Sequence, residues 1–345
     1  MRQGRPVALV AALALLVALA AGAAAPARAS ADDVWSVPFL GANRLERSTE
    51  TQRVHALIVD LCASGVSVRA TAAGEAGLTT SAFGQHVGAL AAVNGGFFER
   101  GMIIKGLALS EGALWQGSFD GSFFGFVAFG AGGARISPPG ERHRRPDPWM
   151  SEVVGGVPAL VVDGTPVVDQ PLPFCIAAHP RTAVGLSRDG RALILAVVDG
   201  RSFEAAGMTC GELAQLMIEL GAYSALNLDG GGSSAMWIQG EGVVNVPSDG
   251  FERSVANHLA VLGGTPASHS SCPDVWPTWT DAVSLAMCGA PIAMLDRLER
   301  PLPWTSSAWL MGAPAPISDR DPDPAYAINS SLGPSRFEQF RAWAW

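Results

Sequence analysis

The chain has 345 residues, with 31 acidic and 23 basic side chains and a formal net charge of −8 at pH 7. This negative balance argues against a polyanion such as nucleic acid as a partner, because phosphate contacts need clustered Lys and Arg. The length allows one large or two ordinary domains, and the pattern along the chain favours one.

The N-terminus has the features of an export signal. Arg2 and Arg5 precede an apolar run from about residue 6 to residue 25, and Ala27-Arg28-Ala29 is the small-x-small pattern of signal-peptidase cleavage. We therefore expect residues 1–29 to be a signal peptide, and the mature chain to be secreted or periplasmic with no membrane span. An uncleaved membrane anchor is the alternative, since the run approaches the roughly 20 residues that span a bilayer. The Ala- and Gly-rich second half of the run favours cleavage.

Several short strands are predicted after an N-terminal extension at residues 30–51. The apolar segments 54–61 and 66–71 are predicted to form a hairpin around Ala63-Ser64-Gly65. A further strand ends at Val93 and leads into Asn94-Gly95-Gly96. Strands are also predicted at 106–109, at 123–129, which is apolar on both faces and therefore central, and at 153–162, which Gly155-Gly156 interrupts.

The clearest unit is a strand, a helix and a second strand at residues 191–198, 208–220 and 223–228. Thr209 and Glu212 form a capping box, and Gly221 stops the helix. Such a crossover is expected to be right-handed with parallel strands. The sequence therefore predicts an α/β (α+β) fold, with a mixed β-sheet and packed helices in a single domain over residues 52–264.

Two aspartates follow the strands of this unit. Asp199 and Asp229 would lie at the carboxyl ends of adjacent or near-adjacent parallel strands, where open sheets bind ligands. Asp229 is followed by three glycines. Glycine accepts positive φ and lets a ligand approach the backbone, and successive amides can form an anion-binding concavity. This turn is therefore the strongest candidate site.

Two familiar glycine motifs do not fit this turn. No lysine follows the glycines and no GxGxxG spacing is present, so nucleotide binding is disfavoured. A serine-hydrolase elbow would read GxSxG on a strand-to-helix turn, whereas GGSSA here leads towards a strand. A serine esterase is therefore a minor alternative.

The C-terminal segment, residues 265–345, is rich in Pro, Trp, Ser and Asp and is expected to be a tail. All five cysteines follow the signal peptide, so disulfides can form. Five cannot all pair. Cys175 with Cys210 and Cys272 with Cys288 are two candidate pairings, and buried free thiols are the alternative.

Five blocks, taken in order, resemble the phosphodiester glycosidase family. They are VNGGFF at 93–98, RTAVG at 181–185, VVDGR at 197–201, LNLDGGGSSAM at 226–236 and RSVANHL at 253–259. The resemblance covers about residues 52–264. It implies a hydrolase that cleaves the bond between a sugar anomeric carbon and a phosphodiester, on a glycan similar to an N-acetylglucosamine-1-phosphodiester.

Such a cleavage needs stabilisation of an oxocarbenium-like sugar, a held phosphate, and a carboxylate as base or nucleophile. The predicted catalytic residues are Asp229, Asp199 and Arg181, with the arginine gripping phosphate oxygens. The predicted substrate-binding residues are Asn94, Gly95, Gly96, Arg201, Gly230, Gly231, Gly232, Ser233, Ser234, Arg253 and Asn257. Simpler roles stay open, with Asp199 capping a turn, Arg181 as a structural partner and Asn94 supplying a left-handed turn.

A second class of function is a non-catalytic protein that binds exopolysaccharide or serves its biosynthesis. The combination of Arg and Asp residues favours an enzyme over such a binder. No metal site is predicted, because the six histidines show no HxxxH or HxH spacing and the cysteines are dispersed. No cofactor is expected, calcium at the aspartate-rich turns is left open, and the expected partner is a phosphodiester-linked carbohydrate.

Overall fold

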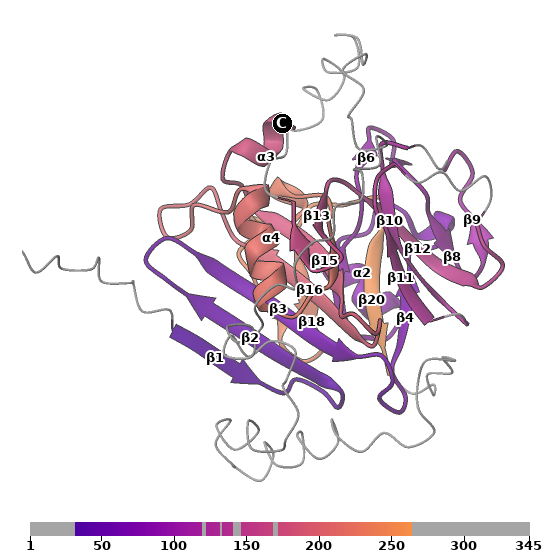
Figure 1. Ribbon diagram of the computed structural model, residues 1–345, viewed down its shortest axis with the longest axis horizontal. Coiled ribbons are helices and arrows are strands. Elements are labelled where there is room, and N and C mark those ends of the chain that lie inside the picture. The colour runs from indigo at the N-terminus through magenta and orange to yellow at the C-terminus, as the bar shows by residue number, and fades with distance from the viewer. Residues whose placement is uncertain (1–31, 119–121, 132, 141–145, 168–171, 264–345) are drawn as a thin grey trace, which may run out of the picture. The chain divides into compact units, whose positions relative to one another are not determined.

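The computed structural model describes residues 32–118, 122–131, 133–140, 146–167 and 172–263, which form a mostly β-sheet domain (Figure 1). The predicted signal peptide (1–29), the tail (265–345) and the pairing of Cys272 with Cys288 lie outside these ranges. In the part that is described, no helix is both long enough and apolar enough to span a membrane.

The largest sheet has eight strands in the order β1-β2-β3-β16-β15-β17-β13-β14. They span Asp32–Ser36 (β1), Ala42–Ser48 (β2), Arg53–Asp60 (β3), Ala192–Val198 (β16), Arg181–Leu186 (β15), Ser224–Asn227 (β17), Ala159–Val162 (β13) and Thr165–Pro166 (β14). β3 and β16 are apolar on both faces, which suits strands in the middle of a covered sheet. Residues 32–48, which the sequence suggested as an extension, supply the first two strands.

Two five-stranded sheets and a two-stranded ribbon complete the β structure. One sheet has the order β11-β10-β12-β8-β9 and the other β19-β18-β5-β20-β4. The central position predicted for β10 is confirmed, since it pairs with β11 and β12. The strands span Gly133–Ser137 (β11), Gly125–Gly130 (β10), Met150–Gly156 (β12), Leu109–Ser110 (β8), Ala113–Leu114 (β9), Gly242–Val243 (β19), Met236–Ile238 (β18), Ala89–Asn94 (β5), His258–Leu262 (β20), Ser67–Ala70 (β4), Phe98–Glu99 (β6) and Ile103–Ile104 (β7).

The helices are α2 (Thr80–His86), α3 (Pro173–Ile176) and α4 (Cys210–Glu219), with 3-10 turns at Ala73–Glu75 and Gly231–Ser233. α4 begins at the predicted capping box, in which Thr209 Oγ1 accepts from the Glu212 amide and the Glu212 carboxylate accepts from the Thr209 amide. It ends before Gly221, which has a φ of +96°, a conformation that glycine adopts readily because it has no Cβ. The disulfide between Cys175 and Cys210 is confirmed and joins α3 to the start of α4.

The central strands of the eight-stranded sheet are buried on both faces. Ile58 and Ile194 pack with α4 on one face, through residues such as Leu213 and Met217. The alternate side chains of the same strands pack in a second cluster with β5 and β10, as Leu57 and Leu195 do with Val93 and Val127. α4 therefore covers one face, as Figure 1 shows, and the five-stranded sheets cover the other.

The structure corrects two predictions. The sheet is not mixed, because every strand pair in the described ranges is antiparallel. β16 and β17 do run parallel, as the crossover requires, but β15 lies between them and pairs with both. Segments 54–61 and 66–71 do not form a hairpin, because β2 and β16 already pair with both edges of β3, and β4 pairs with β20 instead.

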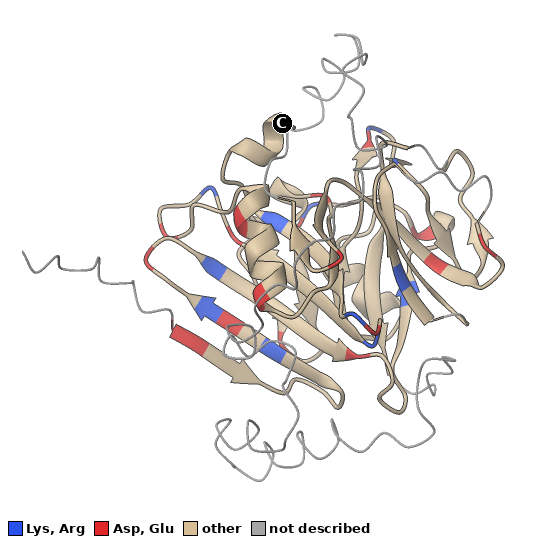
Figure 2. Ribbon diagram, in the orientation of Figure 1, with Lys and Arg blue, Asp and Glu red and all other residues tan. Residues whose placement is uncertain are grey.

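Charged residues are concentrated at the outer edge of the large sheet. Figure 2 shows acidic and basic residues side by side on β1 and β2. Arg47 on β2 bonds Asp33 on β1 at 2.7 Å and Glu219 on α4 at 2.6 Å. Charges of this kind discourage pairing with another chain at an edge strand. The same outer region is separate from the glycine turn after β17, which forms the candidate site.

Candidate active site

The candidate site is built on the turn that follows β17. Three backbone hydrogen bonds hold this turn, from Leu228 N to Thr182 O at 2.8 Å, from Asp229 N to Gly95 O at 3.1 Å and from Gly231 N to Pro180 O at 2.9 Å. The sequence blocks that contain residues 93–98, 181–185 and 226–236 are therefore brought together, as the shared-site prediction requires.

Two buried asparagines fix the geometry of the turn. Asn94 is 0% exposed, and its Nδ2 donates to the carbonyl of Asp229 at 2.7 Å. Its Oδ1 accepts from Thr182 Oγ1 at 2.7 Å and from the Ala235 amide at 3.1 Å. Asn257 is also buried, and its Oδ1 accepts from the Gly96 amide at 2.9 Å. Both side chains contact the protein, so we assign them to positioning the turn.

The glycines at 95 and 96 are required by close packing. A Cβ on Gly95 would lie 2.3 Å from Asn257 Oδ1, and a Cβ on Gly96 would lie 2.2 Å from the carbonyl of Gly155. Neither position has room for a side chain. These two glycines therefore let the end of β5 pack closely against β12 and against the segment that precedes β20.

Asp229 is the carboxylate of the turn that stays partly exposed. Desolvation raises its pKa from 3.8 to about 6, against the lowering effects of the Ser233 hydroxyl, the charge of Arg253 and the Gly230 amide. A carboxyl group with a pKa close to neutral is suited to exchange protons with a substrate.

Two arginines lie against successive glycines of the turn. A Cβ on Gly231 would lie 3.1 to 3.3 Å from the guanidinium of Arg201, and a Cβ on Gly232 would lie 2.2 Å from Arg253 Nη2. Arg201 is exposed and has a φ of +61°, a conformation that non-glycine residues adopt rarely and that occurs at functional sites. The glycines therefore allow a positive charge on each side of the turn.

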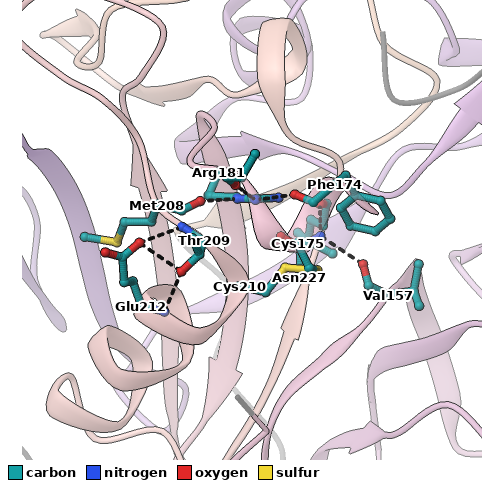
Figure 3. Close-up of a disulfide and its surroundings, with 11 residues drawn as sticks. Val157, Phe174, Cys175, Arg181, Met208, Thr209, Cys210, Glu212 and Asn227 are labelled. Atoms are coloured by element: carbon teal, nitrogen blue, oxygen red, sulfur yellow. Dashed lines mark hydrogen bonds between the residues drawn. A yellow bond between two sulfur atoms is a disulfide. The ribbon is translucent and has the colours of Figure 1, made fainter. Parts of the chain in front are cut away.

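Arg181 has a different environment from these two arginines. It is 2% exposed, and its donors are directed to backbone carbonyls, at 2.7 Å from Nε to Met208 and at 2.6 and 2.9 Å from Nη2 to Phe174 and Ala177 (Figure 3). Burial and then the charge of Arg201 lower its pKa to about 10. Arg181 therefore ties the segment before β15 to the segment before α4, the same two segments that the disulfide joins.

His179, which was not predicted as a site residue, belongs to the same positively charged region. Burial, followed by the charges of Arg181 and Arg201, holds the pKa of His179 below its usual value. The mutual repulsion of these groups indicates a local positive potential that an anion would relieve. Its position two residues before Arg181 was the available signal.

Asp199, the second predicted catalytic carboxylate, lies beneath the turn. It is 4% exposed, and its Oδ1 accepts from Asn245 Nδ2 at 3.2 Å and from the Val246 amide at 3.0 Å. Its Oδ2 is 3.4 Å from Nε2 of His55. Asn245 Nδ2 also donates to the carbonyl of Ser234 at 3.1 Å. Asp199 therefore contacts the turn from the protein interior, through Asn245.

The amides of the turn are largely used by the protein. Gly230 N donates to Asp229 Oδ1 at 3.0 Å and Gly231 N to Pro180 O, whereas Gly232 N has no acceptor among the described residues. Ser233 and Ser234 are both 1% exposed. The Ser233 hydroxyl contacts Asp229 and lies 3.5 Å from Arg253 Nη1. The expected cradle of three free amides is therefore reduced to one.

Asp249 is another residue of the site that was not predicted from the sequence. Its Oδ2 bonds Arg253 Nη2 at 2.6 Å and lies 2.1 Å from where a Cβ on Gly232 would be. The i,i+4 spacing to Arg253 was the only sequence signal. Within the described residues, no three His, Cys, Asp or Glu side chains gather as a metal site would need.

Comparisons with known proteins agree with this architecture. The profile of the phosphodiester glycosidase family matches residues 87–262, about half of the chain. The SPbeta prophage-derived uncharacterized protein YomE of Bacillus subtilis (strain 168) is 41% identical over 83 residues, which cover 24% of this chain and only 13% of that protein.

Two solved structures share the fold. The catalytic domain of zebrafish N-acetylglucosamine-1-phosphodiester alpha-N-acetylglucosaminidase, auto-inhibited by its pro-peptide, has a TM-score of 0.51 and 20% identity, covering 68% of this chain and 82% of that one. A hypothetical protein from Synechocystis has a TM-score of 0.52 and 15% identity, covering 68% of each chain.

Proposed function

Because the chain belongs to the phosphodiester glycosidase family, we propose that it is an exported hydrolase that cleaves the bond between a sugar anomeric carbon and a phosphodiester. The observation that carries this proposal is the Asp229 turn. It combines a partly exposed carboxyl group, whose pKa is raised to about 6, with arginines against two adjoining glycines.

In the proposed reaction, Asp229 acts in one of two ways. As a base it takes a proton from the water that attacks the anomeric carbon, and as a nucleophile it forms a covalent bond to that carbon, which water then hydrolyses. In both cases the bond from the anomeric carbon to oxygen breaks, and the phosphodiester leaves with its electron pair. The leaving phosphodiester is a weak base, so its departure needs less proton donation than that of an alcohol. The larger need is to hold its negative charge, which arginines can do with two parallel hydrogen bonds. We assign the two-bond contact to Arg201. Arg253, whose Nε and Nη2 already bond Asp249, adds positive charge, and the Gly232 amide is a neutral donor.

The remaining predicted site residues take supporting roles in this proposal. Arg181 adds positive potential from the interior and holds the segment that carries Pro180. Asp199 supports the turn through Asn245. Asn94 and Asn257 hold the turn and the neighbouring glycines. Ser233 donates to Asp229 and does not act as a nucleophile, which sets this proposal against the serine esterase.

The disulfide between Cys175 and Cys210 supports export, because disulfides persist in oxidising compartments. The substrate class that fits is a phosphodiester-linked glycan. N-Acetylglucosamine 1-phosphodiester is the first compound to test, since the zebrafish enzyme that shares the fold is named for it.

The test is a panel of glycosyl 1-phosphodiesters incubated with the intact chain, with free sugar as the readout. Release of sugar from at least one member is the expected result. Binding of panel members without any release would support the polysaccharide-binding alternative. Covalent labelling of Ser233 or Ser234 by an active-site phosphonate would instead support the serine esterase.

A further inference from the structure

Asp249 and Arg253 form an ion pair that lies directly on the glycine turn. Arg253 Nη2 and Nε bond Asp249 Oδ2 at 2.6 and 3.1 Å. A Cβ on Gly232 would lie 2.1 Å from Asp249 Oδ2 and 2.2 Å from Arg253 Nη2, so the absence of a side chain at Gly232 is what admits the pair.

The other edge of the same guanidinium contacts the Ser233 hydroxyl, which links it to Asp229. Arg253 Nη1 lies 3.5 Å from Ser233 Oγ, and the Ser233 hydroxyl bonds Asp229. The charge of Arg253 also acts directly on Asp229. Arg253 therefore has Asp249 as its ion-pair partner on one edge and reaches Asp229 through the Ser233 hydroxyl and through its charge on the other.

We propose that Asp249 is a positioning residue of this site. Its carboxylate holds Arg253 over Gly232 by accepting from the Nε and Nη2 atoms of the arginine, and it partly neutralises the arginine charge. The arginine then presents only Nη1 towards Ser233 and Asp229. This inference rests on the proposed function only in taking Asp229 as the catalytic carboxylate. The geometry rests on the ion pair between Asp249 and Arg253.

The charged groups around Asp229 determine what removal of Asp249 should do. Arg253 acts on Asp229 from the loop before β20, and Arg201 lies against Gly231. His179 and Arg181 flank Pro180, whose carbonyl accepts from the Gly231 amide. Asp249 is the ion-pair partner of Arg253, the cation whose charge lowers the pKa of Asp229. Asp249→Asn keeps an oxygen that can accept from Arg253 but loses the negative charge, so Arg253 stays in place and stabilises the ionised form of Asp229 more strongly. Without Arg253, that form is stabilised less.

Variants of the pair should therefore shift the titration of Asp229 in opposite directions. Asp249→Asn should lower the pKa of Asp229 by about 0.5 to 1 unit, and Arg253→Gln should raise it by a similar amount. Gly232→Ala should also raise it, because the new methyl group displaces the ends of two flexible side chains and moves Arg253 off the turn.

The measurement is a ¹³C NMR titration of aspartate carboxyl groups in the intact chain, with Asp229 assigned by its loss in Asp229→Asn. Glu219→Gln is the matched control, since it also removes one carboxylate from an arginine pair, at the remote Arg47, and should leave the Asp229 titration unchanged. A pKa in Asp249→Asn that stays within about 0.2 unit of the parent, or rises, would overturn the proposal.

The design separates this inference from the proposed function. The titration needs no substrate, so opposed shifts in a chain that releases no sugar would refute the hydrolase and retain the positioning role. Sugar release without opposed shifts would do the reverse. If Asp249→Asn does not fold, Gly232→Ala and Arg253→Gln carry the test, and unchanged titration in both would overturn the proposal.

Discussion

The turn after β16 and the turn after β17 begin alike, with a buried strand, an aspartate and a glycine, yet their aspartates have different environments. Asp199 is 4% exposed and accepts two N–H hydrogen bonds, with a histidine beside it. Asp229 is partly exposed, and desolvation raises its pKa to about 6.

The difference comes from what covers each turn. The loop that carries Asn245 and Val246 lies over the Asp199 carboxylate and supplies its donors. In the turn that carries Asp229, the following residues are glycines, and the side chains of Arg201 and Arg253 lie against Gly231 and Gly232. A strand-end aspartate is therefore a candidate for chemistry only when its neighbours leave it accessible and its charge incompletely compensated.

The largest expected effect concerns Asp229 itself. Asp229→Asn should reduce kcat on a cleaved glycosyl 1-phosphodiester by about 10² or more with KM nearly unchanged, because the carboxylate acts mainly in the transition state. Steady-state kinetics measure this, with Glu219→Gln as a remote carboxamide control and thermal melting to confirm folding. A variant that keeps turnover within about threefold of the parent would remove Asp229 from the mechanism.

The next effect should distinguish the buried arginine from the exposed ones. Arg181→Lys should lower the free energy of unfolding by about 2–3 kcal/mol, because a lysine cannot reach the carbonyls of Phe174, Ala177 and Met208 together. Denaturant unfolding with the disulfide intact measures this. A stable Arg181→Lys variant whose only defect is a raised KM would restore Arg181 as a direct phosphate ligand.

The smallest effect on turnover should come from the other aspartate. Asp199→Asn should lower the free energy of unfolding by about 1–3 kcal/mol, since it disturbs the bonds to Asn245 and Val246 and the contact with His55. Its kcat should fall less than that of Asp229→Asn. Loss of turnover equal to that of Asp229→Asn at an unchanged melting temperature would make the two turns equivalent and contradict the comparison.

Local signals in the sequence predicted much of the region around α4. The capping box at Thr209, the stop at Gly221 and the strands on either side depend on neighbouring residues, and the structure confirms them. Strand partners were harder to predict. No local sequence pattern indicates that β15 lies between β16 and β17, or that β4 pairs with β20 and not with β3.

The site was predictable in location but not in detail. The blocks around Asn94, Arg181 and Asp229 were expected to meet, and the structure brings them together through hydrogen bonds between distant segments. Whether a polar side chain faces a ligand or the protein interior depends on packing that the sequence does not display. The sequence therefore predicted catalytic roles for Arg181 and Asp199, for which we propose supporting roles from their burial and hydrogen bonds, and it did not indicate Asp249.

The central claim is that the ionisation of a single carboxyl group, that of Asp229, controls the activity of this site. The most direct test is the pH dependence of kcat/KM for a cleaved glycosyl 1-phosphodiester. Desolvation raises the pKa of Asp229 to about 6, so a base or nucleophile is ionised above that pH and becomes protonated below it. We expect kcat/KM to fall about tenfold per pH unit below pH 6. A profile that stays flat from about pH 7 down to about pH 4.5 would contradict the account.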